Sequence, residues 1–333
     1  MTFWADRPVL VTGGSGFIGS HLVEALLNVD ARVRVAGRNR AKFQSVLGRT
    51  AERVECLEGD LASPEFARLA CMDMDAVFNL AAQVAGVGHN SAHPGTIFTS
   101  NMASGIPLMD AAARTSVDRF LAVSSACVYP RHATVPTPET EGFVDDPEPT
   151  NLGYGWAKRA LEVQARCYSS EFPMKIGIAR PYNGYGPRDN FAWETSHVIP
   201  ALIRKVVEQQ NPLRVWGDGS QTRSFLYVTD FVAGLMLTLE RYAVCDAVNI
   251  GSDEEVSIGR LVELIVELAG NRVRIEFEPD KPGGQPRRRG DYTKAAEVLG
   301  FRAQVPLAEG LRRTIDWYLE TRDEAHPGHP HAQ

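Results

Sequence analysis

Three residues in the middle of the chain could together carry out hydride chemistry on a carbonyl or alcohol. Tyr154 and Lys158 stand four residues apart in the segment YGWAK, so on a helix they share one face. A nearby ammonium group favours ionisation of a phenol, which suits Tyr154 for proton transfer to or from a substrate oxygen. Ser125 ends a predicted strand upstream and could hold that oxygen. A YxxxK pair alone is more often a surface pair, but the three residues together predict a catalytic triad.

A glycine-rich loop near the amino end could bind a dinucleotide. Gly13, Gly16 and Gly19 follow the GxxGxxG spacing in VTGGSGFIGSHL, directly after a predicted strand and at the start of a predicted helix. Glycine permits the tight turn and lets backbone N–H groups approach a pyrophosphate, and the helix dipole favours that anion. A purely structural turn is the alternative. We expect these glycines, with Phe17 and Ile18, to contact the cofactor.

The end of the second predicted strand bears on the choice of cofactor. It reads VAGRNR, with Arg38 and Arg40 and no carboxylate. An acidic residue there would bind a ribose 2′-hydroxyl, whereas arginine accommodates a 2′-phosphate. The sequence therefore favours NADP(H), with NAD possible if both arginines are simply solvated. We also expect the cofactor to contact Asp60, Leu61 and Ala81, although Asp60 could equally cap a helix.

Alternating strands and helices must position these residues. Short apolar runs that end in small or polar residues predict strands over Pro8–Thr12, Arg32–Ala36, Arg53–Leu57, Ala76–Leu80 and Phe120–Ser124. Helical stretches lie between them, such as those over Ile18–Leu27 and Gly105–Ser116. This alternation predicts an α/β fold with a Rossmann-type, doubly wound parallel sheet. Ligands of such sheets bind at the carboxyl ends of the strands.

The pattern changes after about residue 180, where prolines and glycines interrupt the chain. Beyond that point the sequence predicts helices over Leu226–Glu240, Val256–Ala269 and Leu307–Thr321, and strands over Ala247–Ile250 and Arg272–Phe277. We therefore expect two interleaved lobes. Residues 1–180 plus about 226–250 would form the dinucleotide-binding domain, and residues 181–225 plus 251–322 a smaller α/β substrate-binding lobe. Residues 323–333 are expected to be a disordered tail, and its His326, His329 and His331 no metal site.

Composition excludes several classes of protein. The chain has 333 residues, enough for about two domains, and a net charge of −6, which gives no basic excess for nucleic-acid binding. No apolar run reaches the roughly 18 residues of a membrane span, and the first residues lack a signal-peptide pattern. Five widely spaced cysteines without a CxxC pair predict neither a disulfide framework nor a zinc ribbon. We expect a cytoplasmic protein without nucleic-acid or membrane partners.

At the glycine loop and the triad the sequence resembles the extended short-chain dehydrogenase/reductase family of NAD(P)-dependent nucleotide-sugar enzymes. The resemblance runs through NLAA (Asn79–Ala82) to the C-terminal helix. Within the family it is closest to the GDP-L-fucose synthase branch, at SSACVYP, YGPRDNF…SHVIPALIRK and KPGGQPRR. The stretches SSAC, VWGDGSQTRSF and VNIGSDEEVS look more like the GDP-mannose 3,5-epimerase branch. Ala126 also departs from fucose synthases, which usually have a second serine there.

The resemblance implies that Cys127 and His197 carry out epimerisation. A 4-keto group acidifies the adjacent C–H bonds, so a thiolate can remove a proton from one face while an imidazolium delivers one to the other. Taken alone, Cys127 would more often be a small buried hydrophobe and His197 a residue at a helix start. The resemblance further implies that the sugar nucleotide is held by Asn183, Trp216, Arg223 and Arg287. Trp216 could instead belong to a core, and Arg288 and Arg289 are expected to be solvated.

The resemblance as a whole implies an NADP-dependent epimerase/reductase that inverts C3 and C5 of a GDP-4-keto-6-deoxyhexose and reduces C4. A redox-neutral epimerase of a GDP-sugar or another nucleotide sugar, with tightly bound NAD, remains open. A non-catalytic dinucleotide sensor is a remote alternative, because a sensor needs no proton relay. The resemblance also implies a homodimer through a helix bundle that includes Gly105–Ser116 and Tyr154–Phe172. No catalytic metal is implied.

Overall fold

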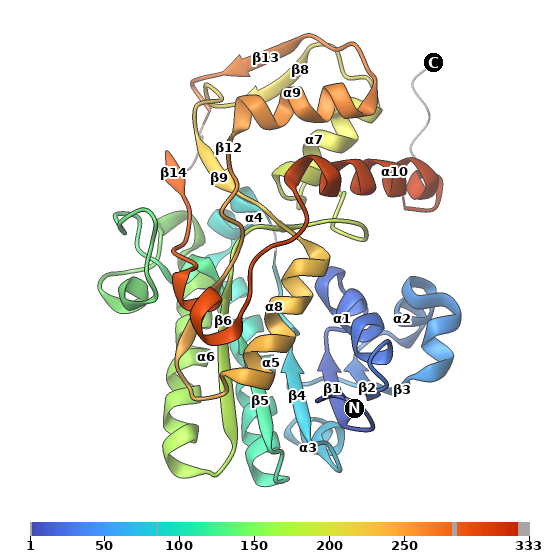
Figure 1. Ribbon diagram of the computed structural model, residues 1–333, viewed down its shortest axis with the longest axis vertical. Helices are drawn as coiled ribbons and strands as arrows, with labels where there is room; N and C mark the ends of the chain where they lie inside the picture. Colours follow the sequence, from blue (N-terminus) through green and yellow to red (C-terminus); the bar gives the residue numbers. More distant parts are fainter. Residues whose placement is uncertain (1, 85, 282–284, 326–333) are drawn as a thin grey trace.

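The computed structural model describes residues 2–84, 86–281 and 285–325. Its main sheet contains seven parallel strands in the order β11-β6-β5-β4-β1-β2-β3. The strands are β1 (Pro8–Thr12), β2 (Arg32–Gly37), β3 (Glu55–Glu58), β4 (Ala76–Asn79), β5 (Arg119–Val123), β6 (Lys175–Pro181) and β11 (Ala247–Ile250) (Figure 1). The strand order reverses between β1 and β4, which is where doubly wound sheets bind their ligands.

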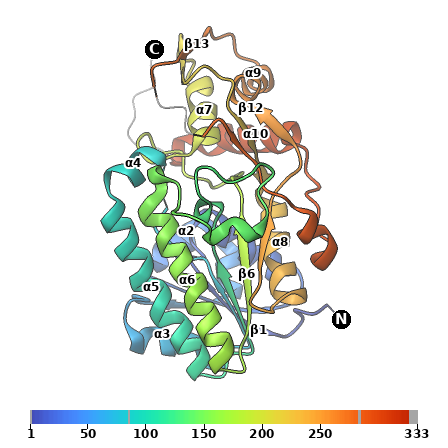
Figure 2. The ribbon, with the colours of Figure 1, turned by 90° about the vertical axis from the view of Figure 1, so that its left-hand side faces the viewer.

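Helices cover both faces of this sheet, which explains why its strands are nearly continuous apolar runs. One face forms a core with α1 (Phe17–Leu27), α2 (Arg40–Leu47) and α8 (Val228–Arg241). The other face forms a core with α3 (Pro64–Cys71), α5 (Pro94–Arg114) and α6 (Leu152–Glu171). α5 and α6 run side by side along the outside of the molecule (Figure 2). The predicted doubly wound α/β fold is thus confirmed.

A smaller group of elements lies beyond the carboxyl ends of the strands, at the top of Figure 1. The helices α7 (Val198–Val207), α9 (Ile258–Ala269) and α10 (Leu307–Ala325) pack with the parallel pair β8 (Leu213–Trp216) and β13 (Ile275–Glu278) around a separate core. A three-stranded sheet in the order β12-β9-β14 lies between this core and the main sheet. Its strands are β12 (Glu255–Ser257), β9 (Thr222–Ser224) and β14 (Arg287–Arg288).

Element boundaries differ from the prediction where a local signal was missed. α5 begins at Pro94, well before the predicted Gly105, because proline is favoured in the first turn of a helix and Pro107 is tolerated inside this one. α9 begins at Ile258, after Val256, since the Ser257 hydroxyl caps it by accepting the N–H of Arg260 at 3.1 Å.

The last helix also departs from the prediction. α10 runs to Ala325, so residues 323–325 belong to a helix and not to the predicted disordered tail. No proline or glycine interrupts the chain between Thr321 and Ala325, and the residues there are tolerated in helices. The rest of the predicted tail, with its three histidines, lies outside the described residues.

Two negative findings hold for the part of the chain that the structure describes. None of its helices combines the length and apolar character needed to cross a membrane. No cluster of three or more His, Cys, Asp or Glu side chains in that part is arranged to hold a metal ion. All five cysteines are described and have free thiols.

Candidate active site

The glycine loop connects β1 to α1 and leaves the start of the helix open to a ligand. Gly13 has a φ of +70°, and a Cβ there would lie 3.0 Å from the backbone just after β4. A Cβ at Gly19 would lie 2.2 Å from the Gly13 carbonyl oxygen, so the helix can pack this closely only with glycine. Gly16 provides no side-chain cap, and the half-buried Phe17 and Ile18 form the first turn. This cradle fits the pyrophosphate of a dinucleotide.

The other residues expected to contact the cofactor follow neighbouring strands. Arg38 follows β2 and is exposed, so its guanidinium is accessible to a phosphate group. Asp60 follows β3, and its carboxylate accepts the N–H of Ala62 at 3.0 Å. Leu61 is buried, whereas Ala81 follows β4 and is half-buried. These positions surround the switch point between β1 and β4.

Ser125, Tyr154 and Lys158 meet at the carboxyl end of β5. Ser125 begins the short helix η2 (Ala126–Val128), and the other two lie one turn apart on α6. Tyr154 and Lys158 are only 8% and 6% exposed. The Lys158 ammonium donates to the Val123 carbonyl at 2.8 Å and lies 5.5 Å from the centre of the Tyr154 ring. The structure thus brings the three predicted residues together.

Burial governs the protonation of this pair. Burial raises the pKa of the Tyr154 phenol, Cys127 raises it further, and the hydrogen bond with Ser125 lowers it. Burial also lowers the pKa of Lys158 to about 8, while Cys127 acts in the opposite direction. At neutral pH the phenol is therefore protonated and can give its proton to a substrate oxygen, whereas the expectation that Lys158 favours its ionisation is not met because burial dominates.

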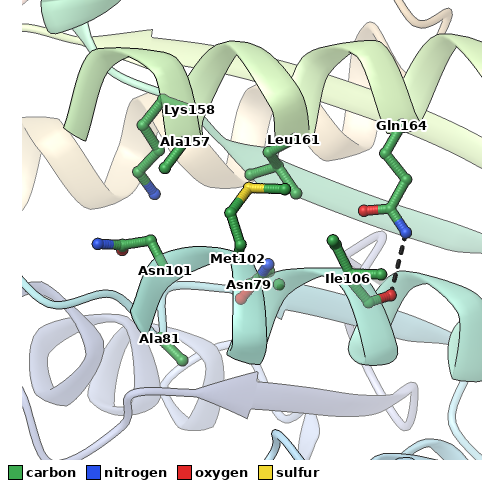
Figure 3. A pocket seen from close by; sticks show the side chains of 10 residues that line it. Asn79, Ala81, Asn101, Met102, Ile106, Ala157, Lys158, Leu161 and Gln164 are labelled. Atoms are coloured by element: carbon green, nitrogen blue, oxygen red, sulfur yellow. Dashed lines mark hydrogen bonds between the residues drawn. The ribbon is translucent and has the colours of Figure 1, made fainter. Parts of the chain in front are cut away.

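A cavity lies between α5 and α6 beside Lys158 (Figure 3). Lys158, Asn79 and Asn101 line one part of it, and Gln164 lines another. The Asn101 amide is fixed by donating to the Ile97 carbonyl at 2.7 Å. The amine of the catalytic lysine therefore has polar amide groups close by, as the pocket in Figure 3 shows.

Cys127 lies in η2, and two contacts fix it next to the triad. Its N–H donates to the Ser125 hydroxyl at 3.1 Å, and its sulfur atom accepts from Arg288 Nη2 at 3.4 Å. Arg288 was expected to be solvated, but it is half-buried against this thiol. Burial lowers the pKa of Arg288, but Cys127, Tyr182 and Glu148 together raise it more, so the guanidinium stays charged. Arg288 thus places a cation directly beside the predicted base.

The register of β14 explains why Arg288, which was expected to be solvated, faces Cys127 while Arg287 does not. β14 pairs in parallel with β9, with Arg288 opposite Arg223 and Arg287 opposite Thr222. Because adjacent strand residues point to opposite faces, Arg223 and Arg288 share one face and Arg287 points the other way. Burial, together with the nearby Arg288, lowers the pKa of Arg223 to about 10. Two close arginines form a setting for an anion such as a diphosphate.

Arg287 was expected to hold the sugar nucleotide, but its side chain has another partner. It forms two hydrogen bonds with the Glu255 carboxylate, at 2.7 and 2.8 Å. Hydrogen bonding from Arg287 lowers the pKa of Glu255 to about 2, against the effect of burial. The structure therefore brings Arg288, and not Arg287, next to Cys127.

Two further residues of the expected nucleotide site lie apart from the main sheet. Asn183 is half-buried, and its amide donates to the Ser224 carbonyl at 2.8 Å. This bond joins the end of β6 to β9, the strand that carries Arg223. Trp216, at the end of β8, is 57% exposed and so lies outside the core, with its ring open to a ligand.

His197 immediately precedes α7, and its side chain is 46% exposed and otherwise covered by protein. Its Nδ1 lies 3.9 Å from Oδ1 of the buried Asp189. Burial lowers the pKa of His197, but Asp189 raises it more, so the net pKa lies above its usual value. The Thr195 carbonyl accepts the N–H of Gly86 at 3.1 Å, which places this segment against the loop after β4. Cys127 thus follows the carboxyl end of β5, and the segment that precedes His197 contacts the loop that follows β4.

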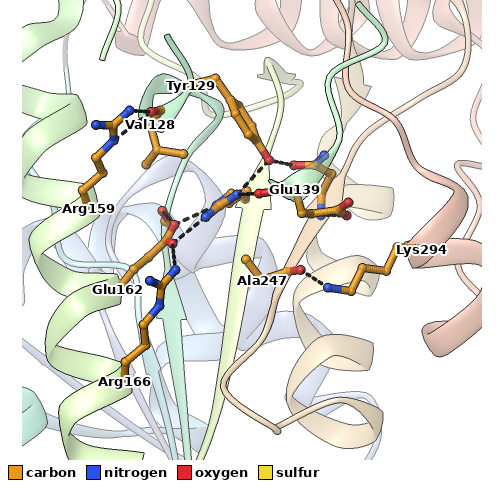
Figure 4. A network of polar contacts seen from close by, with 11 residues as sticks. Val128, Tyr129, Glu139, Arg159, Glu162, Arg166, Ala247 and Lys294 are labelled. Carbon is orange, nitrogen blue, oxygen red and sulfur yellow. Dashed lines mark hydrogen bonds and ion pairs between the residues drawn. The ribbon is translucent and has the colours of Figure 1, made fainter. Parts of the chain in front are cut away.

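A buried polar network centred on Glu162 of α6 lies close to the predicted triad in the sequence and the fold (Figure 4). Arg180 on β6 donates to both carboxylate oxygens of Glu162 on α6, at 2.8 and 2.7 Å, and both side chains are almost fully buried. The Ser124 hydroxyl donates to the same carboxylate at 2.5 Å. Because Ser124 precedes Ser125 and Glu162 lies one turn after Lys158, the network holds both catalytic segments in a fixed relation.

This network was not predicted, although the amino-acid sequence contains a signal for it. Arg180 is a charged residue in the otherwise apolar strand sequence KIGIARP, and Glu162 lies on the same face of α6 as Lys158. Arg180 also donates to the Tyr129 hydroxyl at 3.0 Å, and Tyr129 donates to Asn249 at 2.5 Å. A buried charge must be paired, so an arginine in a buried strand predicts a carboxylate partner.

Known proteins match this chain along most of its length, over the main sheet and over the smaller group of elements that contains α7, α9 and α10. The model of the NAD dependent epimerase/dehydratase family matches residues 9–251. Probable GDP-L-fucose synthase 1 of Oryza sativa subsp. japonica is 34% identical over 326 residues, which cover 96% of this chain and 94% of that protein. GDP-mannose 3,5-epimerase 1 of Oryza sativa subsp. indica is 30% identical and covers 96% and 84%. The solved UDP-glucose 4-epimerase of Thermotoga maritima with UDP-glucose has a TM-score of 0.84 at 28% identity, and covers 95% and 100%.

Proposed function

Because this chain belongs to the NAD dependent epimerase/dehydratase family of nucleotide-sugar enzymes, we propose that it is an NADP-dependent epimerase/reductase. Its substrate would be a GDP-4-keto-6-deoxyhexose, inverted at C3 and C5 and then reduced at C4. One observation carries the proposal: Cys127 hydrogen-bonds the triad serine, and the segment that precedes His197 bonds the loop after β4, the neighbour of β5. A reductase without epimerisation needs the triad alone.

The residues of the chain divide the reaction between them. Cys127 removes a proton from the carbon next to the C4 ketone, and His197 delivers a proton to the opposite face. Ser125 holds the C4 oxygen, and Tyr154, whose phenol burial keeps protonated, gives it a proton during reduction. The glycine loop would hold the cofactor pyrophosphate, and bound NADPH supplies the hydride. Arg223 and Arg288 would hold the diphosphate of the substrate.

The test is direct. Purified protein is mixed with GDP-4-keto-6-deoxymannose and NADPH in deuterated water, and the absorbance of the reduced cofactor is followed. We expect cofactor oxidation together with deuterium at C3 and C5 of the product, as measured by mass spectrometry. Oxidation no faster than the background without enzyme would reject the reductase proposal.

A second candidate is a redox-neutral 3,5-epimerase, favoured by the 30% identity with a GDP-mannose 3,5-epimerase. It would hold NAD tightly throughout the reaction without net consumption of the cofactor. One measurement distinguishes the two candidate functions. The redox-neutral enzyme would release NAD⁺ on denaturation and exchange solvent deuterium into a GDP-hexose without net change in cofactor absorbance.

Arg38 is expected to select NADPH through the 2′-phosphate. Arg38→Ala should raise the KM for NADPH about 10- to 100-fold, the effect of losing a charge-assisted contact of about 1.5–3 kcal/mol. The KM for NADH, which lacks the phosphate, serves as the internal control and should stay nearly constant. An equal rise for both cofactors would assign Arg38 to general binding and leave the NADP preference without support.

We also propose that the protein is a homodimer formed through α5 and α6. Their outer surface exposes large apolar side chains, which are 38–47% accessible: Phe98, Ile106, Leu152, Trp156 and Val163. Trp156→Glu should place a charge in the interface and shift the protein to a monomer, as measured by light scattering after size-exclusion chromatography. Val244→Glu is the matched control, because Val244 is 62% exposed and lies outside these helices. Equal masses for both variants would contradict this interface.

A further inference from the structure

Asp189 is a buried carboxylate beside His197 with one oxygen atom unused. Its side chain is only 4% exposed, and its Oδ1 accepts the N–H of Asn190 at 2.7 Å. Its Oδ2 has no hydrogen-bond partner among the described residues. A buried carboxylate in this condition is costly unless a cation compensates its charge. Among the described residues Asp189 forms an ion pair with His197, when that ring is protonated, and the His197 Nδ1 lies 3.9 Å from Oδ1.

The other charged or titratable groups on the neighbouring segments form no ion pair with Asp189 or His197 among the described residues, and Arg188 Nη1 and Arg204 Nε have no hydrogen-bond partner there. They are Arg188, paired with Glu24 at 2.6 Å; His21, bonded to the Pro187 carbonyl at 2.9 Å; Arg204, bonded to the Phe191 carbonyl; and the exposed Glu194. Asp189 is also the one charged group that raises the pKa of His197. The charge on the imidazole therefore depends on Asp189.

Two features of the fold oppose a positive charge on His197. The residue occupies the N-cap of α7, where the helix dipole disfavours a cation. Burial also lowers its pKa. Without Asp189 the ring would lose the group that raises its pKa, so a smaller fraction of it would carry the proton that it must deliver at neutral pH. With Asp189 the ring is charged more readily, as a proton donor must be.

We propose that Asp189 is a positioning residue that holds His197 protonated and oriented as the proton donor of the epimerisation, an inference that rests on the function proposed above. When Nδ1–H points to Asp189, Nε2–H is left to face the substrate, in the manner of other carboxylate–histidine pairs. The carboxylate itself touches no reacting atom.

The epimerisation step balances in protons and electrons. Cys127 as thiolate takes a proton from the carbon beside the ketone, so a C–H bond breaks, an S–H bond forms, and the electron pair becomes an enolate. His197 then gives its Nε2 proton to the other face of that carbon, a new C–H bond forms, and the ketone returns. Nothing is oxidised or reduced, and both side chains recover their starting states by proton exchange with water.

The experiment compares Asp189→Asn with the matched control Asp118→Asn, whose carboxylate precedes β5 at the opposite end of the sheet. NMR titration of the His197 ring, assigned with His197→Gln, reports its pKa directly. In Asp189→Asn we expect a lower His197 pKa and at least about 10-fold slower deuterium entry at neutral pH, part of the 10²–10⁴-fold that general acid–base catalysis supplies. The decrease in the rate of deuterium entry at alkaline pH should begin at a lower pH than in the wild type. Asp189→Glu should restore part of the His197 pKa and part of the rate.

A second readout separates positioning from general damage. Reduction of an already epimerised 4-keto sugar by NADPH needs no proton from His197, so its rate should be the same in Asp189→Asn and Asp118→Asn. An unchanged His197 pKa and pH profile in Asp189→Asn would overturn the inference. If Asp189→Asn does not fold, a wild-type His197 pKa below 6.5 overturns it by itself. A wild-type protein without turnover would instead reject the proposed function, and the titration would still decide the role of Asp189.

Discussion

Tyr154→Phe is expected to slow NADPH oxidation by about 10²–10⁴-fold, the contribution of a well-placed general acid. The variant removes only the hydroxyl group, so the buried ring still packs beside Lys158. Cofactor affinity should therefore change little, as measured by quenching of protein fluorescence on titration with NADPH. The slowed step should be hydride transfer itself, which single-turnover absorbance measurements resolve.

Tyr168→Phe is the matched control for this prediction. Tyr168 lies on the same helix, and its hydroxyl donates to Asp110 at 2.8 Å, away from the triad. It should oxidise NADPH at nearly the wild-type rate. Cys127→Ser should give the converse pattern, with deuterium entry lost and reduction of an epimerised substrate retained. Full turnover by Tyr154→Phe would mean that another group protonates the C4 oxygen.

Glu162→Ala should lower the free energy of unfolding by about 3–5 kcal/mol, the typical cost of leaving a buried charge without its partner. Arg180 would keep its positive charge in a site that is 2% exposed, and Ser124 would lose its acceptor. Urea denaturation, followed by circular dichroism, measures this loss. Catalysis in the folded fraction should also fall, because Ser124 holds the segment that carries Ser125.

An exposed ion pair provides the control for this prediction. Glu263→Ala breaks a pair with Arg260 on α9 whose side chains are 52% and 56% exposed. Its effect should stay within about 0.5 kcal/mol, since water and salt already screen such pairs. Replacing both Glu162 and Arg180 with apolar residues should recover part of the lost stability. Similar losses for Glu162→Ala and Glu263→Ala would contradict the assigned role of the network.

Much of the main sheet could be predicted because its strands are buried on both faces. β1 and β11 have the predicted boundaries, since their apolar runs end at glycine or polar residues. β3 begins at Glu55, two residues later than predicted, because the preceding residues form a short helical turn over Gly48–Arg53. The predicted end of α10 was too early, because no helix-breaking residue follows Thr321 before Ala325 and composition does not mark the last turn of a helix.

The candidate site was predictable where one local motif places each residue. The glycine loop and the YxxxK pair fall within single elements, so spacing suffices to bring their residues together. Arg288 and Asp189 were missed because their roles depend on pairing between distant segments. The register of β14 on β9 decides which arginine faces Cys127, and the packing of Asp189 beside His197 is set by tertiary structure. Neither the register of β14 nor the packing of Asp189 can be derived from the spacing of residues along the chain.

β14 contributes only two residues to the fold, yet it sends arginines to both sides of a small sheet at the rim of the molecule. The glycine loop lies between β1 and α1, and the triad lies on η2 and α6, so neither shares a residue with this small sheet. Substitutions in this short strand would therefore change the charges beside Cys127 and Arg223 while the glycine loop and the triad keep their residues, which makes β14 a compact place to alter the site by mutation.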